Sequence, residues 1–171
     1  MKIYVISDSH GDFDSLYKIF KKASPAPDLL IFLGDGIKEI NDISSIFNIP
    51  LIAVRGNNDI DADEPYERIE IIKNHRILIT HGHGYKIYKG KEPLINKAKE
   101  NNCGIALFGH THVQYLEKLD GITLFNPGAI KFARSGSKKG YGVIYIEGTK
   151  IKFKHIDINN NLFLRLKNFC F

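Results

Sequence analysis

The feature that most constrains the fold is a repeated pattern in which a short apolar run ends in a polar, glycine-containing turn. The runs begin at Ile3, Leu29, Leu51, Arg76 and Ile105. Short runs of this composition are typical of buried strands. Apolar residues with helical spacing fill the gaps after the first two runs, at 13–20 and 37–47. The resulting β-α-β-α-β order predicts an α/β fold with a parallel sheet and right-handed crossovers.

The second half of the chain is richer in strand patterns. We expect strands at 69–72, 76–80, 105–108 and 150–155, a helix at 93–102, and hairpin turns at Asp120-Gly121 and Glu147-Gly148. The length of 171 residues, with 43% hydrophobic and 25% charged residues, suits one globular domain. We therefore predict a single domain over residues 1–171.

Several other classes of protein are excluded by the sequence. No apolar run approaches the roughly 20 residues of a membrane helix. The N-terminus turns acidic after a few apolar residues and lacks the pattern of a secretory signal. Cys103 and Cys170 are the only cysteines and frame no disulfide scaffold. We expect a cytoplasmic protein.

Positive charge is concentrated in the last part of the sequence. Residues 131–171 hold 9 of the 24 Lys+Arg and only 2 of the 19 Asp+Glu. Such a segment can attract phosphates or nucleic acid, but a lysine-rich solvated face is the simpler interpretation. No arginine-rich run or aromatic RNA-binding motif accompanies it. Nucleic acid is therefore not expected as a specific partner.

Side chains able to bind metal ions occupy the turns that follow the apolar runs. They are Asp8, His10, Asp35, Asn57, His81, His110 and His112. Ligands of open α/β sheets bind at the carboxyl ends of the strands, where these turns lie. Imidazole and carboxylate suit Mn, Fe, Co, Ni or Zn, and one Asp can bridge two cations. The convergence of so many candidates predicts two divalent ions.

Each of these motifs alone has a structural interpretation. Asp after a strand is commonly a turn residue or a helix cap, and a single His-x-His motif can arise by chance. The candidate ligands form five sets, one after each of the five apolar runs. Their occurrence together at the ends of predicted strands favours a metal site over these interpretations. His75 and His155 belong to none of these motifs, and we expect both at the surface.

The motifs also resemble those of a known family, the calcineurin-like metallophosphoesterases. The matching blocks are Asp8-Ser9-His10, Gly34-Asp35, Gly56-Asn57-Asn58-Asp59, His81-Gly82-His83 and Gly109-His110-Thr111-His112. Asn126-Pro127-Gly128-Ala129 further resembles a loop of the small single-domain prokaryotic phosphodiesterases. The resemblance implies a four-layer α/β/β/α sandwich of two facing mixed sheets. It also implies two metal sites that share Asp35, one with Asp8, His10 and His112, the other with Asn57, His81 and His110.

The resemblance further implies a function. It predicts a metal-dependent phosphodiesterase, with Mn or Ni among the suitable ions, in which a metal-bridging hydroxide attacks the phosphorus of a small phosphate diester. A non-catalytic scaffold is the alternative, because the same fold occurs in a retromer subunit that docks partners. A phosphomonoesterase or a nuclease on the same site is a third interpretation. A homo-oligomer is compatible with all three.

Four further residues near the blocks are candidates for catalytic roles. Asn58 stands where many family members have a His, and an amide cannot act as an acid near neutral pH. Asp59 either orients a ligand imidazole or is a turn residue. Arg55 is expected to neutralise a site carboxylate or touch phosphate, and His83 to support a ligand or contact substrate.

Overall fold

The structure, a computed structural model, describes residues 1–159 and the backbone of 163–167. Its strands are β1 (Lys2–Ile6), β2 (Leu29–Phe32), β3 (Leu51–Ala53), β4 (Glu67–Ile72), β5 (His75–Thr80), β6 (Ile105–Leu107), β7 (Tyr115–Leu119), β8 (Ile122–Asn126), β9 (Gly140–Glu147), β10 (Lys150–Asp157) and β11 (Phe163–Lys167). Its helices are α1 (Phe13–Lys21), α2 (Ile37–Phe47), α3 (Glu92–Glu100) and the short 3₁₀ helix η1 (His83–Tyr85).

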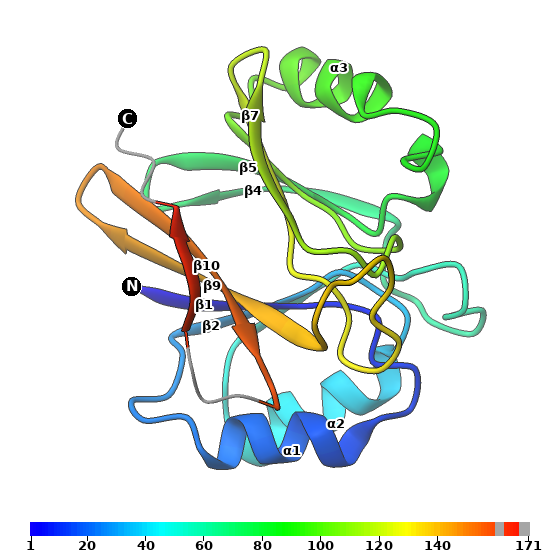
Figure 1. The fold of residues 1–171 in the computed structure, drawn as a ribbon, viewed down its shortest axis with the longest axis vertical. Coiled ribbons are helices and arrows are strands. Elements are labelled where there is room, and N and C mark those ends of the chain that lie inside the picture. The colour runs from blue at the N-terminus through cyan, green and yellow to red at the C-terminus, as the bar shows by residue number, and fades with distance from the viewer. Residues whose placement is uncertain (160–162, 168–171) are drawn as a thin grey trace.

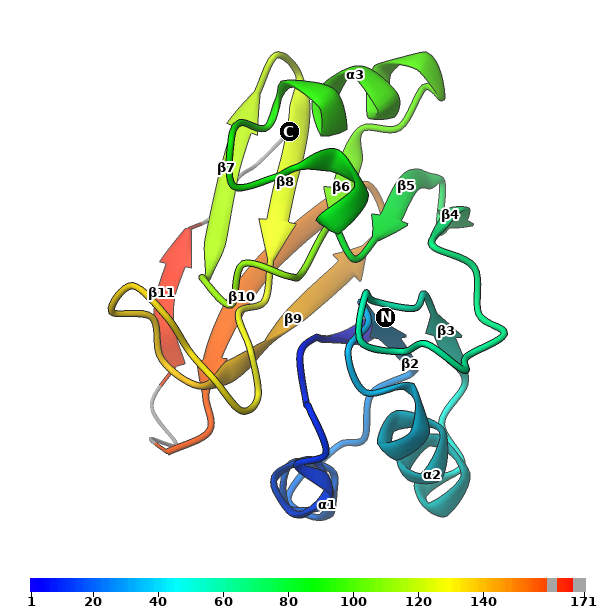
Figure 2. The same cartoon turned by 90° about the vertical axis from the view of Figure 1, so that its right-hand side faces the viewer.

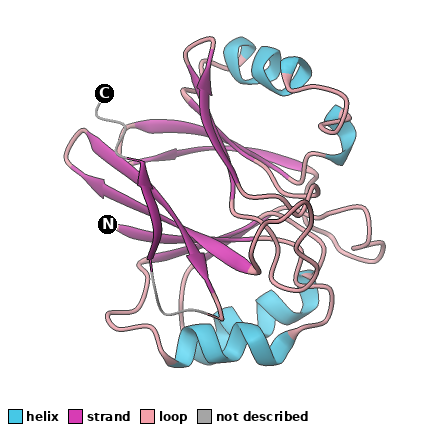
Figure 3. Cartoon of the chain, in the orientation of Figure 1, coloured by secondary structure: helices cyan, strands magenta, loops and turns pink. Residues whose placement is uncertain are grey.

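The strands form two mixed sheets. The first has the order β11-β10-β9-β1-β2-β3 and the second β4-β5-β6-β8-β7. In the first sheet β1, β2 and β3 are parallel, while β9 runs antiparallel to β1 and to β10. In the second, β5, β6 and β8 are parallel, and β4 and β7 close the edges in the antiparallel sense. The two sheets face each other, with α1 and α2 outside one and α3 outside the other (Figures 1 and 3). The predicted four-layer α/β/β/α sandwich is confirmed.

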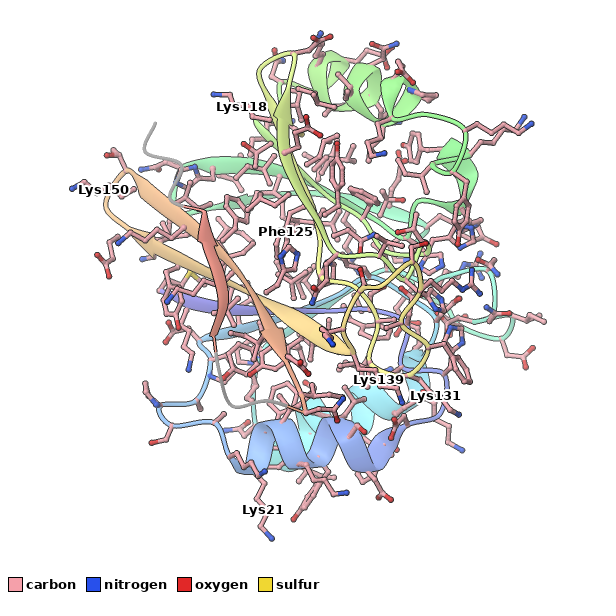
Figure 4. All side chains as sticks on the ribbon, viewed as in Figure 1. Lys21, Lys118, Phe125, Lys131, Lys139 and Lys150 are labelled. Atoms are coloured by element: carbon pink, nitrogen blue, oxygen red, sulfur yellow. The ribbon has the colours of Figure 1, made fainter. Side chains whose placement is uncertain are left out.

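Three apolar layers hold the sandwich together. Between the sheets lie side chains such as Val5, Ile79 and Phe125, the last labelled between the two sheets in Figure 4. The layer under α1 and α2 includes Leu16, and the layer under α3 includes Leu94. Central strands are thus buried on both faces, which explains why they are continuously apolar in sequence instead of alternating.

The predicted elements are recovered with small shifts in their ends. The predicted hairpins are the β7–β8 and β9–β10 pairs. Neither η1 nor β11 was predicted from the sequence. Cys170 lies outside the described residues. None of the helices in the described part of the chain has both the length and the apolar character that crossing a membrane requires.

The loops that follow β1, β2, β3, β5 and β6 gather at one edge of the sandwich. They lie on the right-hand side of Figure 1, and Figure 2 views this edge directly. The segment between β8 and β9 joins them there. All of the turns that carry candidate ligands therefore meet at this edge, although they are far apart in the sequence.

Candidate metal centre

Five of the seven candidate ligands lie close together. The Nε2 atom of His112 is 3.0 Å from Oδ1 of Asp8 and 3.3 Å from Nε2 of His10. Asp35 Oδ2 lies 3.4 Å from Nε2 of His81 and 3.8 Å from Nε2 of His10. These contacts make two overlapping groups that could each hold a metal ion, Asp8–His10–His112 and Asp8–Asp35–His81.

The remaining ligand candidates sit beside these groups. The ring centroid of His110 lies 5.0 Å from that of His81, and the His110 backbone N–H donates to Asp8 Oδ2. Asn57 is exposed. Its neighbour Asn58 instead donates to Asp35, from the backbone N–H at 2.9 Å and from the side-chain amide at 2.6 Å.

The backbone of the site is held in an uncommon conformation. Positive φ angles occur at Asp8 (56°), His10 (45°), Asp35 (63°), His110 (66°) and His112 (59°). A non-glycine residue in the left-handed region costs on the order of 1 kcal/mol, so five such residues together are expensive. Strain of this kind clusters at functional sites, where the surrounding fold over-determines it.

Two glycines let neighbouring turns approach the carboxylates. A Cβ atom added at Gly56 would lie 2.0 Å from Asp35 Oδ1, and one added at Gly109 would lie 2.0 Å from Oγ of Ser7. That Ser7 hydroxyl donates to Asp8 Oδ2 at 2.6 Å. Both carboxylates are therefore packed against backbone that only glycine allows.

Two of the imidazoles are oriented by backbone carbonyls. His81 Nδ1 lies 2.6 Å from the carbonyl oxygen of Leu33, and His112 Nδ1 lies 2.6 Å from that of Phe132. A carbonyl can only accept, so each Nδ1 carries a proton and each Nε2 is directed into the site. Such partners commonly fix the tautomer of metal-binding histidines.

The donor set fits a divalent transition metal. His81 Nε2 and Asp8 Oδ1 are buried and have no hydrogen-bond partner. Buried polar atoms are costly unless something satisfies them, and these two face the same cluster. Imidazole nitrogens and carboxylate oxygens in such proximity are the ligands that Mn, Fe, Co, Ni or Zn accept.

Charge coupling sets the protonation of the cluster in the absence of metal. Burial raises the pKa of Asp35, but the neighbouring His81 imidazole and the hydrogen bonds from Asn58 outweigh it and leave the pKa well below its usual range. Burial lowers the pKa of His81, but Asp35 and Asp8 more than compensate and raise it. Burial, together with the charge of His81, lowers the pKa of His110 to about 4. His110 is therefore neutral at pH 7 and able to act as a ligand.

Asp59 and Arg55 contact the backbone of the loops around the cluster. The Asp59 carboxylate accepts the backbone N–H groups of Asp35, Gly36, Ile37 and Gly56 at 2.6–3.0 Å. Both oxygens are used in this way, so Asp59 fixes the loops and the start of α2 instead of an imidazole. The Arg55 guanidinium donates to the carbonyl of Ala62 and lies 4.1 Å from the ring centroid of Tyr66. It braces the loop after β3 and makes no described ion pair with a site carboxylate.

His83 lies beside the cluster. Its ring centroid is 5.4 Å from that of His81 and 6.0 Å from that of His110. Burial, with the charge of His81, lowers its pKa, so His83 is neutral at pH 7.

Residues at the end of β8 and in the segment after it support the site, a role that the sequence analysis did not assign to them. Buried Asn126 donates its amide to the Gly109 carbonyl at 2.8 Å, and Lys131 Nζ donates to the His10 carbonyl at 2.9 Å. The backbone N–H of Arg134 donates to the His112 carbonyl at 3.1 Å. The Asn126-Pro127-Gly128 motif was the available signal, but its partner loops could not be known from sequence.

Comparison with known proteins defines the class of this site. Over residues 1–149 the sequence matches the calcineurin-like phosphoesterase superfamily domain. The chain belongs to this family, which confirms the resemblance drawn from the motifs, and its homologues are named metallophosphoesterases and phosphodiesterases.

Its relatives span nearly the same length. The chain is 31% identical over 171 residues to the probable metallophosphoesterase YsnB of Bacillus subtilis (strain 168), covering 98% of both proteins. It is 25% identical over 172 residues to the phosphodiesterase YfcE of Escherichia coli (strain K12), covering 84% of this chain and 87% of that one. Vacuolar protein sorting 29 of Cryptosporidium parvum has the same fold, with a TM-score of 0.81 at 16% identity and coverage of 98% and 97%.

Proposed function

We propose that the protein is a dinuclear metal-dependent phosphodiesterase that hydrolyses small phosphate diesters. The observation that carries the proposal is the pair of overlapping ligand groups that share Asp8, with Asp35 Oδ2 near both His10 and His81. A pair of adjacent sites is the arrangement that phosphoryl transfer by two ions requires. The name of the Escherichia coli relative, a phosphodiesterase, supports the same reaction.

We assign the candidate ligands to two metal sites and give separate roles to two neighbouring residues. Asp8, His10, Asp35 and His112 would hold one ion, and Asp35, Asn57, His81 and His110 the other. Bound divalent ions would supply Lewis-acid polarisation of the phosphoryl oxygens and a water of lowered pKa as nucleophile. Asn58 holds the Asp35 carboxylate in place through two hydrogen bonds. His83 is placed to meet the substrate beside His81 and His110.

Metal analysis combined with hydrolysis tests this proposal. Protein stripped of metal and reloaded with Mn, Ni, Fe, Co or Zn should bind two ions per chain and hydrolyse bis(4-nitrophenyl) phosphate faster than 4-nitrophenyl phosphate. Asp35→Asn should lower occupancy of both sites, whereas His112→Ala should affect mainly one. His75→Ala, which changes a histidine outside the cluster, is the matched control and should retain both ions. At most one tightly held ion in reloaded wild type would contradict the dinuclear site.

A scaffold role is the second candidate, favoured by the fold shared with vacuolar protein sorting 29. The intact set of ligand residues supports the enzyme instead, because unpaired buried charges are costly unless they bind something. Hydrolysis that is absent with every metal, in protein that binds two ions, would favour the scaffold. We propose that the protein acts in the cytoplasm on a small phosphate diester. Size-exclusion chromatography tests whether it forms homo-oligomers.

A further inference from the structure

Exposed aromatic rings surround the metal-binding histidines. Tyr66, Tyr88 and Phe132 are 52%, 57% and 52% exposed. The ring centroid of Tyr66 lies 5.5 Å from that of His83. The centroid of Tyr88 lies 5.2 Å from that of His110, and the centroid of Phe132 lies 5.6 Å from that of His10. Among the exposed large hydrophobic residues of the described chain, one other aromatic ring appears, Tyr17 on α1. Exposed aromatics are therefore concentrated at the site.

Each of these three rings has a cationic side chain beside it. The Arg55 guanidinium lies 4.1 Å from the centroid of Tyr66, and Lys131 Nζ lies 5.1 Å from that of Phe132. Arg134 donates to the Tyr88 hydroxyl at 2.9 Å. Arg55 lies closer to the Tyr66 ring, at 4.1 Å, than Lys131 lies to the Phe132 ring, at 5.1 Å, so we base the inference on Tyr88 and Phe132. We call these two residues the aromatic rim.

The aromatic rim is fixed to the backbone of the ligand residues. The Tyr88 hydroxyl donates to the His110 carbonyl at 2.9 Å. The Phe132 carbonyl accepts the Nδ1 proton of His112, and neighbouring Lys131 donates to the His10 carbonyl. Phe132 therefore borders the Asp8–His10–His112 group, and Tyr88 borders His110 next to His81 of the other group. Figure 4 shows Lys131 at this edge of the molecule.

We propose that the aromatic rim recognises a planar base, so that the preferred substrate is a small nucleotide-type phosphodiester. This inference rests on the proposed function, because the metal site would hold the phosphate between the two rings. Aromatic faces stack on bases regardless of their sequence, and nearby Lys and Arg attract phosphate charge. Packing against imidazoles explains the contacts of these rings, but it does not explain why both residues are more than half exposed.

Two substrates with the same leaving group test the proposal. Thymidine 5′-(4-nitrophenyl phosphate) and methyl 4-nitrophenyl phosphate differ only in the group that stays on phosphorus, a nucleoside or a methyl. We expect kcat/KM for the thymidine ester to be about 5- to 100-fold higher, the range that one stacked base supplies. Equal kcat/KM values for the two esters would overturn base recognition by the aromatic rim. Hydrolysis of both esters would still support the proposed function. Hydrolysis of neither would overturn the proposed function and the rim with it.

Substitutions test whether the aromatic rim causes the preference for the thymidine ester. Phe132→Leu and Tyr88→Leu should raise KM for the thymidine ester more than they lower kcat, which brings the ratio of the two substrates toward one. Phe132→Tyr keeps an aromatic face and should retain the preference. Tyr17→Leu removes an exposed ring on α1, which contacts the rings of Phe13 and Phe47, and should leave hydrolysis of both substrates unchanged. A ratio that stays at the wild-type value in both Leu variants would overturn the assignment.

A binding measurement gives a readout that does not depend on turnover. The sequence contains no tryptophan, so Phe132→Trp introduces a single reporter into the rim. In the Mn²⁺-loaded variant, AMP should quench this fluorescence saturably. Ribose 5-phosphate, which lacks the base, should displace AMP only at concentrations at least about 5-fold higher than AMP itself requires. Absence of quenching, or displacement at equal concentrations, would overturn the inference.

Discussion

Asn58 shows how one residue changes what the site can do. Its backbone and side-chain N–H groups both donate to Asp35, which fixes a carboxylate between His10 and His81. A neutral amide has no proton to give to a departing oxygen near pH 7. The residue that stands where many family members have a His therefore supports a ligand but cannot assist the leaving group as an acid.

The leaving group should accordingly control the rate. General acid assistance is typically worth about 10²–10⁴-fold and matters most for alkoxides of high pKa. We expect aryl diesters to be hydrolysed much faster than unactivated alkyl diesters, and Asn58→His to raise the alkyl rates selectively. The measurement is a leaving-group series in single turnover at saturating metal.

The control for this series is Asn58→Ala, which removes the side-chain hydrogen bond to Asp35 without adding an acid. It should slow all leaving groups by a similar factor. A flat dependence on leaving-group pKa in wild type would mean that another residue supplies the proton, and His83 beside His81 is the first to test.

At the residue scale, the clustering of candidate ligands could be predicted from the sequence, whereas the contacts of the residues around them could not. Asp8, His10, Asp35, His81, His110 and His112 follow strands, and the topology of parallel strands brings strand ends together. Asp59 and Arg55 lie in the same sequence block, but their roles depend on which backbone groups the loops present. Hydrogen-bond partners across loops have no periodic signature in a sequence.

Among the elements, the turns after β2 and β3 depend most closely on each other. Gly56 follows β3, and its backbone approaches the Asp35 carboxylate that follows β2. Asp59 then ties the two turns together through four backbone N–H groups. The position of Asp35 is therefore a property of two elements and not of its own turn alone.

Gly56→Ala tests this dependence. Its Cβ would lie 2.0 Å from Oδ1 and 2.7 Å from the backbone nitrogen of Asp35, so the turns must separate. We expect a loss of about 1–3 kcal/mol in the free energy of unfolding, as overpacking typically gives, together with weaker metal retention. Urea denaturation and metal analysis measure both effects.

Gly104→Ala is the matched control, since a Cβ there meets no atom within 4 Å. It should change the free energy of unfolding by no more than about 0.5 kcal/mol. Similar stability and metal content in the two variants would contradict the close packing of Gly56 on Asp35.

The elements themselves were easier to predict than their arrangement. Strands buried on both faces are continuously apolar, and Asp120 with Gly121 adopts the positive φ angles that the hairpin signal predicts. The pairing of β1 with β9, by contrast, joins residues such as Ile3 and Ile144 that lie far apart in the chain. Local patterns carry no information on such partners, so the split into two sheets came only from the family resemblance.

For the whole molecule, the net charge of +5 is distributed over several faces. Figure 4 places Lys131 and Lys139 near the site, whereas Lys21, Lys118 and Lys150 lie on other parts of the surface. Neutralisation of a polymer backbone needs a continuous basic surface, unlike recognition of a small nucleotide at the aromatic rim.

We therefore expect weak binding to long RNA or DNA that falls steeply as salt increases, because it would come from counterion release. Fluorescence anisotropy with a labelled oligonucleotide at about 50 and 200 mM salt measures this dependence. Nanomolar affinity that survives the higher salt would contradict the prediction and favour a nuclease.

The two sheets are also joined by a titratable contact. His155 on β10 is partly buried, contrary to its expected place at the surface. Its Nε2–H donates to the carbonyl of Asn126 at the end of β8, at 2.8 Å, and its ring stacks on Phe125 with centroids 4.8 Å apart. Burial lowers the pKa of His155, although the Asn126 carbonyl acts in the opposite direction. The neutral form is therefore favoured in the folded protein.

This contact should make stability depend on pH. An unfolded histidine titrates near pH 6.5, and the folded His155 titrates below that value. Between the two pKa values the unfolded chain binds more protons, so the contribution of His155 to stability is complete above about pH 6.5 and is lost as pH falls.

His155→Gln can still donate to Asn126 but does not titrate. Its free energy of unfolding should decline less steeply with acid than that of wild type, by at most about 1.4 kcal/mol per pH unit for one proton. Urea denaturation from pH 8 to 5 measures the difference, in which Asp35, Glu67 and the site histidines, common to both proteins, cancel. Parallel curves for the two proteins would show that His155 keeps its ordinary pKa between the sheets.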